Sequence, residues 1–150
     1  MSKVGRGRRI GFDYGAARIG IALSDPDGIL ASPQPFLAND ENTALKLQEI
    51  FAENQPIYCV LGYPRHLSGA LGSSSSAVED FAGLLEEISG VPIFLIDERL
   101  TTRQASQHLR QVGKRTHEQK SLIDSQSAVV ILESALANER NGREPGERWK

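Results

Sequence analysis

Asp13 is the first residue whose type and position could do chemistry. Residues 8–14 alternate between large apolar and small side chains, which predicts a β-strand with Asp13 on the same face as Gly11. Small neighbours let a helix or a ligand approach a strand closely. An acid at the end of such a strand is a candidate for binding or catalysis, and a turn-forming role ahead of Gly15 is the plainer alternative.

A second acidic position follows another predicted strand. Asp97 and Glu98 come directly after residues 91–96, a continuous apolar run typical of a parallel strand buried on both faces. Ligands of open α/β sheets bind beyond the carboxyl ends of the strands. The alternative for either acid is an ion pair with Arg99 or Arg103. The residues alone leave the choice between Asp97 and Glu98 open.

A third acid, Asp124, lies within a helix predicted over residues 116–137. The positions four, seven and eleven residues further on are Ala128, Ile131 and Ala135, so Asp124 shares a face with apolar side chains. A charge on a core-facing stripe is costly unless it is paired or bound to a metal. The alternative is an ordinary acid near a helix N-terminus, where the helix dipole favours it.

Taken together, these acids favour one carboxylate cluster. Carboxylates without a set of Cys or His ligands favour a hard cation, Mg²⁺ or Mn²⁺. Cys59 is the only cysteine, which excludes an internal disulfide and a cysteine-based zinc site. Its position inside an apolar strand is typical of a small core residue. His66, His108 and His117 show no metal-ligand spacing, and His66 is an acid–base candidate only if its loop reaches the site.

The surrounding pattern predicts the elements that position these residues. Five strands are expected over residues 8–14, 17–24, 29–37, 57–61 and 91–96, and helices over 40–54, 76–89, 101–113 and 116–137. The first two strands form a hairpin and the helix-separated apolar runs are parallel, which predicts an α/β fold with a mixed five-stranded sheet flanked by helices. We expect one domain over residues 1–137. Residues 138–150 are polar and predict a flexible C-terminal tail, an interpretation that leaves Trp149 unexplained.

The composition of the 150 residues is that of a globular protein with one core, with 39% hydrophobic and 24% charged residues. The chain contains no apolar run of membrane-spanning length, and its basic N-terminus lacks the apolar core of a signal peptide, which predicts a cytoplasmic protein. The net charge of −2 argues against a strongly basic nucleic-acid binder. However, residues 25–53 carry six acids and one base, and residues 99–120 carry six bases and one acid, so one face can be basic.

Four motifs, in order along the chain, resemble those of the YqgF family, whose members are also described as RuvX-like Holliday junction resolvases and as pre-16S rRNA nucleases. The motifs are Asp13-Tyr14-Gly15-x-x-Arg18-Ile19-Gly20, Gly62-Tyr63-Pro64 followed by Gly69, Asp97-Glu98-Arg99-Leu100-Thr101-Thr102, and Asp124-Ser125-x-Ser127-Ala128-x-x-Ile131-Leu132-Glu133. The resemblance covers residues 8–137. The chain departs from the family at Ala16, where Thr is frequent, and around His66 and Gly69-Ala70, where Asn and a Gly-Thr pair are frequent. These departures spare the three acids and affect substrate contacts.

The resemblance implies a ribonuclease H-like fold and a nuclease activity. The family's acidic site corresponds to Asp13, Glu98 and Asp124, which selects Glu98 over Asp97. These acids would hold one or two Mg²⁺ or Mn²⁺ ions for phosphodiester hydrolysis. Basic residues expected to bind phosphates without reading sequence are Arg18, Arg99, Arg103, Lys114, Arg115 and Lys120. Residues expected to shape the loops of the site are Gly15, Gly62, Pro64, Gly69, Thr101 and Thr102.

The implied substrate is structured nucleic acid. Processing of the 5′ end of pre-16S rRNA in ribosome biogenesis is favoured, with ribosomal precursor particles as partners, and branched DNA at a Holliday junction is the alternative. Endonuclease and exonuclease activity both remain open, as do a monomer and a homodimer. A non-catalytic RNA-binding assembly factor is a rival that the complete acid trio disfavours. An ATP-binding phosphotransferase shares the Asp-x-Gly hairpin, but it needs a second lobe for which 150 residues leave no room.

Overall fold

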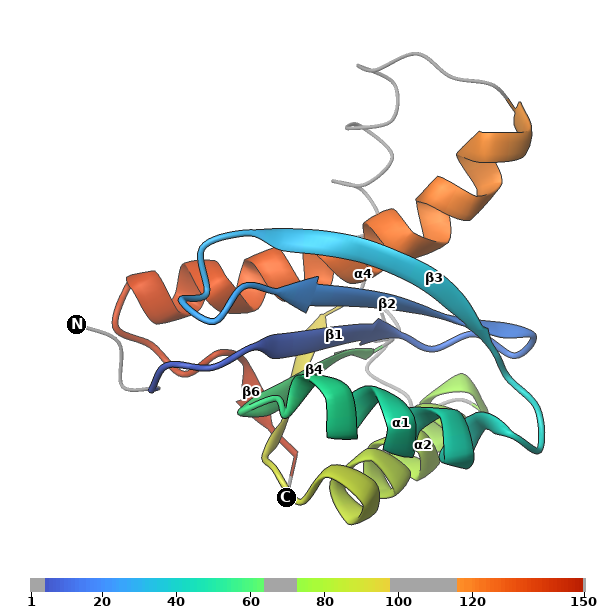
Figure 1. Cartoon of the computed structure of the whole chain (residues 1–150), viewed down its shortest axis with the longest axis horizontal. Coiled ribbons are helices and arrows are strands. Elements are labelled where there is room, and N and C mark those ends of the chain that lie inside the picture. The colour runs from blue at the N-terminus through green and yellow to red at the C-terminus, as the bar shows by residue number, and fades with distance from the viewer. Residues whose placement is uncertain (1–4, 64–72, 98–115, 150) are drawn as a thin grey trace.

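The structure is a computed structural model that describes residues 5–63, 73–97 and 116–149, with the side chains at 73–75 and 116–125 outside the description. Its elements, in chain order, are β1 (Arg9–Asp13), β2 (Arg18–Ser24), β3 (Ala31–Ala38), α1 (Thr43–Asn54), β4 (Tyr58–Tyr63), α2 (Ser73–Ser89), β5 (Ile93–Asp97), α4 (Thr116–Arg140) and β6 (Glu147–Arg148) (Figure 1). No helix within the described ranges has the length and apolar character needed to cross a membrane.

The described strands form one mixed sheet in the order β3-β2-β1-β4-β5-β6. β1 pairs antiparallel with β2 and parallel with β4, and β4 pairs parallel with β5. The predicted mixed α/β sheet is therefore confirmed, with β3 at an edge as its two prolines indicate. The sheet has six strands where the sequence predicts five, because the C-terminal segment adds β6 antiparallel to β5.

Helices cover both faces of the sheet (Figure 1). On one face, Ile10 and Phe12 of β1 belong to a core cluster with Leu47 and Phe51 of α1 and with four residues of α2. On the other face, the core cluster consists of α4 residues packed against side chains of β2, β4 and β5. Because successive side chains of a strand point to opposite faces, each strand residue can be assigned either to the α1/α2 face or to the α4 face.

The C-terminal segment differs from the expected flexible tail over residues 138–150. α4 continues to Arg140, and the chain turns back at Gly142, whose φ of 74° suits glycine. The Asn138 side-chain amide donates to the Pro145 carbonyl at 2.9 Å, and the Trp149 amide donates to the Ile93 carbonyl at 2.9 Å. Trp149 also packs against the core of the α1/α2 face, which accounts for a residue that the sequence leaves unexplained.

A buried ion pair ties the C-terminal end of α4 to the sheet. Two nitrogens of the Arg9 guanidinium of β1 donate to the Glu139 carboxylate of α4. Nη2 donates to Oε1 at 2.8 Å, and Nε donates to Oε2 at 3.2 Å. The Tyr58 hydroxyl of β4 donates to the same carboxylate. Burial raises the pKa of Tyr58, and the negative charge of Glu139 raises it further. With the remaining Arg9 donors bound to backbone carbonyls, this network holds α4 in one register on β1.

The helix expected over residues 101–113 lies outside the described residues. The helix expected over residues 76–89 begins three residues earlier, at Ser73.

Candidate active site at the carboxyl ends of the parallel strands

Asp13 is the last residue of β1 and is half-buried. Its parallel neighbour β4 ends at Tyr63, and β5 ends at Asp97, which pairs with Tyr63 in the sheet register. The carboxyl ends of these three strands therefore meet at one edge of the sheet. This is the edge at which ligands bind in open α/β sheets.

The face of the sheet on which Asp13 lies follows from Gly11. A Cβ atom at Gly11 would stand 2.9 Å from the Leu132 Cβ and 3.0 Å from the Ala128 carbonyl oxygen, so α4 rests directly on the glycine backbone. Asp13 is two residues further along the same strand, and it therefore shares the α4 face with Gly11. The sequence expectation that a small residue beside Asp13 allows a helix to approach is confirmed.

The direction of α4 brings its N-terminal half toward the same edge. Glu139 contacts Arg9 at the start of β1, and Ala128 and Leu132 contact Gly11 in the middle. The helix thus runs antiparallel to β1. One turn before Ala128, about 6 Å along the axis, is Asp124, so its backbone lies toward the Asp13 end of the strand. The Asp124 side chain is outside the described part of the chain.

Asp97 lies on the opposite face from Asp13. Phe94 and Ile96 pack with the α4 cluster, while Ile93 and Leu95 pack with the α1/α2 cluster, so the alternation assigns Asp97 to the α1/α2 face. Glu98 lies outside the described residues. The structure therefore places Asp97 and Asp13 on opposite faces of the sheet.

A small hollow beside Asp13 is lined by Asp13, Gly15, Ala17 and Arg18. The Arg18 guanidinium lies over the Phe36 ring, with 4.8 Å between the guanidinium carbon and the ring centroid. This stacking of a cation on an aromatic face restrains the arginine beside the carboxylate. A Cβ at Gly15 would stand 2.5 Å from the Arg18 carbonyl oxygen, so this turn requires glycine.

Sequence reasoning missed two residues, Phe36 of β3 and Asn39 in the turn that follows β3. Asn39 donates from its side-chain amide to the Gly15 carbonyl at 2.7 Å and from its backbone to the Ala17 carbonyl at 3.0 Å, which fastens the turn after Asp13. Phe36 supports Arg18. Both contacts join segments about 20 residues apart, so no local motif indicates them.

The other predicted site residues are described only in part. Gly62 is a buried residue of β4 on the α4 face, and Gly15 lies in the hollow. Lys120 is placed only as a backbone position in α4. The remaining predicted residues, Arg99, Arg103, Lys114, Arg115, Pro64, Gly69, Thr101 and Thr102, lie outside the described ranges.

Within the described residues, no group of three or more His, Cys, Asp or Glu side chains is arranged to hold a metal ion. Asp13 is the one member of the predicted acid trio whose side chain is described. The predicted donor set consists of carboxylates alone, which is the chemistry that suits a hard divalent cation such as Mg²⁺ or Mn²⁺.

A family model described as "RuvX: Holliday junction resolvase" matches residues 7–138. The chain belongs to the RuvX family. This confirms the resemblance to the YqgF family, and the match includes Asp13, Glu98 and Asp124 within its bounds. It ends before the segment that forms β6.

Similar proteins agree with this membership. A relative from Streptomyces coelicolor is 45% identical over 146 residues, which cover 95% of this RuvX chain and 87% of the relative. A relative from Mycobacterium tuberculosis is 44% identical over 135 residues, covering 88% of this chain and 79% of the relative. Both carry the description "Putative pre-16S rRNA nuclease".

The fold is similar to that of RuvC from Thermus thermophilus. The TM-score is 0.58 at 12% identity, and the similarity covers 95% of this chain and 99% of that one. A second structure, of T. thermophilus RuvC in complex with a Holliday junction substrate, gives a TM-score of 0.59 at the same identity and coverage. At this identity the likeness concerns the fold, and the predicted ribonuclease H-like fold is confirmed.

Proposed function

We propose that this RuvX chain is a metal-dependent nuclease that hydrolyses phosphodiester bonds in structured nucleic acid, with the 5′ end of pre-16S rRNA as its substrate. Family membership and the description of the relatives as pre-16S rRNA nucleases support the reaction and the substrate. The single observation that carries the proposal is the position of Asp13. It lies at the carboxyl end of β1, on the face of the sheet where α4 packs closely against Gly11.

The proposed catalytic carboxylates are Asp13, Glu98 and Asp124. Asp124 is supported by the antiparallel course of α4, which carries its backbone toward Asp13. Glu98 is supported by the assignment of Asp97 to the opposite face, because that assignment leaves Glu98 as the acid of the motif available to the Asp13 side.

These three side chains would hold Mg²⁺ or Mn²⁺. A divalent cation in such a site supplies Lewis acidity, lowering the pKa of a water and stabilising charge on the phosphoryl and leaving oxygens. The carboxylates would hold the cation at the carboxyl ends of the parallel strands, and Arg18, stacked on the Phe36 ring, would bind a substrate phosphate beside it. The predicted basic residues Arg99, Arg103, Lys114, Arg115 and Lys120 would extend phosphate binding without reading base sequence.

We also propose a cytoplasmic location and ribosomal precursor particles as partners, with the chain a monomer or a homodimer. The second candidate function is resolution of Holliday junctions. The description of the matching family model and the fold likeness to RuvC favour it.

One side-by-side experiment separates these functions. A pre-16S rRNA fragment with its 5′ extension and a four-way DNA junction are incubated with the protein under Mg²⁺, Mn²⁺ or EDTA, and the products are mapped at nucleotide resolution. The proposal expects metal-dependent cleavage of the RNA at a defined position. Faster cleavage of the junction would favour the second function, and RNA binding without cleavage under either metal would favour a non-catalytic assembly factor.

A further inference from the structure

The turn that joins β1 to β2 has no polar side chain of its own. Its residues 15–17 are Gly-Ala-Ala, so no side chain within the turn can hydrogen-bond to the backbone. The turn is also tight, because a Cβ at Gly15 would stand 2.5 Å from the Arg18 carbonyl oxygen. Asp13 precedes the turn and Arg18 follows it, and both line the same hollow. The relative position of these two charged residues therefore depends on what holds the turn from outside.

Asn39 holds the turn from the neighbouring segment. Its side-chain Nδ2 donates to the Gly15 carbonyl at 2.7 Å, and its backbone amide donates to the Ala17 carbonyl at 3.0 Å. Ala38, immediately before it, pairs with Arg18 in the sheet register. The segment that leads from β3 to α1 therefore contacts the turn at the same end of the sheet (Figure 1).

Asn39 is itself held in place by one buried hydroxyl. Thr43 Oγ1, at the start of α1, donates to the Ala38 carbonyl at 3.0 Å and accepts from the Asp40 amide at 2.9 Å. Ala38 and Asp40 are the residues on either side of Asn39. Because Thr43 is only 6% exposed, water competes little for these two bonds. The packed body of α1 is thus connected to the turn through Asn39.

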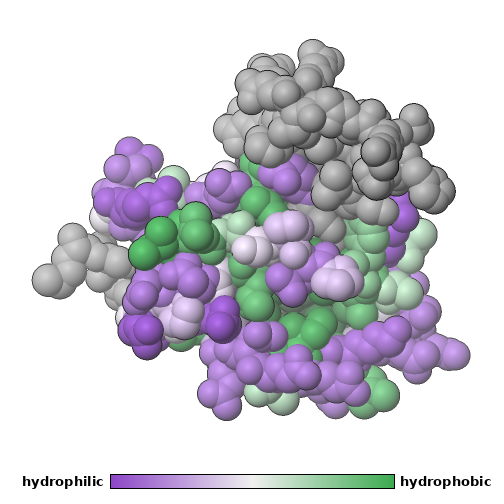
Figure 2. Space-filling view, turned by 45° about the horizontal axis from the view of Figure 1, so that its top comes forward, coloured by the Kyte–Doolittle hydropathy of each residue, from purple (hydrophilic) through white to green (hydrophobic). Residues whose placement is uncertain are grey.

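Arg18, which follows the turn, is a restrained cation. Hydrophilic side chains are spread over the face seen in Figure 2, so a polar residue at the surface is not by itself a sign of function. The Arg18 guanidinium, however, lies 4.8 Å from the centre of the Phe36 ring of β3. The end of β3 therefore supports Arg18 twice, through Phe36 under its side chain and through Asn39 at the turn. A cation that is already held loses less conformational freedom when it binds a phosphate.

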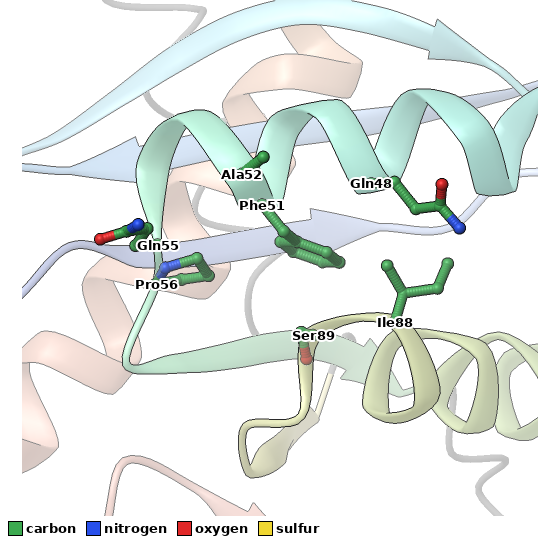
Figure 3. Close-up of a pocket in the computed structure, with 7 residues that line it drawn as sticks. All are labelled: Gln48, Phe51, Ala52, Gln55, Pro56, Ile88 and Ser89. Carbon is green, nitrogen blue, oxygen red and sulfur yellow. The ribbon is translucent and has the colours of Figure 1, made fainter.

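Another hollow of the structure shows the contrast. The pocket between α1 and α2 has a volume of about 430 Å³ and is lined by no charged side chain, with Phe51 and Ile88 facing one another across it (Figure 3). It has no cation to bind a phosphate. The hollow beside Asp13 combines a carboxylate with a held cation, and the turn that Asn39 fastens forms part of its lining.

We propose that Asn39 is a positioning residue of the candidate site, which fixes the turn after Asp13 so that Arg18 meets a substrate phosphate. Asn39 acts through Arg18 and not on the phosphate itself. A neutral side chain thereby controls a charged contact with the nucleic acid. The inference rests on the proposed binding of a nucleic-acid phosphate by Arg18, and it adds a requirement that neither the four motifs nor the three acids contain.

A double-mutant cycle tests whether Asn39 acts through Arg18. Binding of the pre-16S rRNA fragment is measured in EDTA, where no metal supports cleavage, over a series of salt concentrations. The chains compared are the wild type, Asn39→Ala, Arg18→Ala and the double variant, each first checked for folding by circular dichroism and thermal melts. Asn39→Ser is a second variant, because a serine side chain is too short to reach the Gly15 carbonyl but keeps a polar group at the surface.

Asn138→Ala is the matched control. The Asn138 side-chain amide also donates to the backbone carbonyl of a turn, that of Pro145, at 2.9 Å. Like Asn39, Asn138 is half-buried, but it lies at the C-terminal end of α4, away from Asp13. The two alanine variants therefore remove the same kind of hydrogen bond at opposite ends of the sheet.

We expect Asn39→Ala to weaken RNA binding severalfold and Arg18→Ala to weaken it about tenfold, with the double variant no weaker than Arg18→Ala alone. Loss of one phosphate contact flattens the dependence of log K on log salt concentration by about 0.7–0.9. Asn39→Ala should shift this slope toward that of Arg18→Ala, although it removes no charge. Asn39→Ser should behave as Asn39→Ala does, and Asn138→Ala should leave both affinity and slope unchanged.

Additive losses in the double variant would overturn the proposal, as would weaker binding by Asn39→Ala with an unchanged salt slope. Wild-type affinity in either Asn39→Ala or Arg18→Ala would overturn it as well. Cleavage under Mg²⁺ or Mn²⁺ is scored separately. A wild-type chain that binds the RNA but does not cleave it would count against the nuclease proposal and leave the result for Asn39 standing.

Discussion

Replacement of Gly11 by alanine tests whether α4 rests on β1 closely enough to set the geometry of the site. The added Cβ would meet the Leu132 Cβ at 2.9 Å and the Ala128 carbonyl oxygen at 3.0 Å. Ordinary contacts of this kind are several tenths of an ångström longer. One of the two atoms belongs to the helix backbone, which cannot rotate away as a flexible side chain does, so α4 must move as a body.

The expected cost follows from these distances. Inserting a methyl group into a well-packed core destabilises a protein by about 1–3 kcal/mol. A Gly→Ala change also removes conformational freedom from the unfolded chain, which restores about 0.5–1 kcal/mol. At the middle of these two ranges the net loss of unfolding free energy is roughly 1–1.5 kcal/mol, or a fall in Tm of roughly 2–6 °C for a chain of this size. Because α4 carries Asp124, we also expect the rate of cleavage to fall more than substrate affinity does.

Urea denaturation monitored by circular dichroism measures the first effect, and single-turnover cleavage measures the second. Gly83→Ala is the matched control, because its Cβ would meet only the Trp149 ring, at an ordinary 3.6 Å, and alanine favours the α2 helix. Gly83→Ala should leave stability unchanged or raise it slightly. A Gly11→Ala chain as stable and active as the wild type would refute the close packing of α4 on β1.

Three further predictions concern other contacts. Phe36→Leu keeps an apolar side chain but removes the aromatic face under Arg18, so KM for the nucleic acid should rise a fewfold with little change in kcat, and Phe36→Tyr should restore it. Burial raises the pKa of the Cys59 thiol to about 12, so it stays protonated at pH 8; iodoacetamide should label it only after denaturation, and rapid labelling of the folded chain would contradict its place in β4. Glu139→Ala leaves the buried Arg9 guanidinium without its anion and should lower the unfolding free energy by about 3–5 kcal/mol in urea titrations.

The sequence predicted the features that depend on local periodicity. The alternation in β1 placed Asp13 and Gly11 on one face, and the apolar runs marked β4 and β5 as central parallel strands. The 3.6-residue period placed Asp124 in the helix that proves to be α4. These patterns are repeated over several residues, so single substitutions do not obscure them.

Contacts between distant residues were beyond the same reasoning. The Arg9–Glu139 pair joins positions 130 residues apart, and the polar composition around Trp149 gave no sign that the C-terminal segment would return to the sheet as β6. The separation of Asp97 from Asp13 also needed the observed packing of Phe94 and Ile96. Each depends on tertiary packing that no local pattern encodes.

The central claim is that Asp13 is a catalytic carboxylate of a metal-dependent nuclease. The most direct measurement compares cleavage of a pre-16S rRNA fragment by the wild-type chain and by Asp13→Asn under Mg²⁺ and Mn²⁺, after circular dichroism and thermal melts have shown that both are folded. We predict that the wild-type chain cleaves with either metal and not in EDTA, and that cleavage by Asp13→Asn falls to background. Full cleavage by a folded, contaminant-free Asp13→Asn chain would contradict the claim.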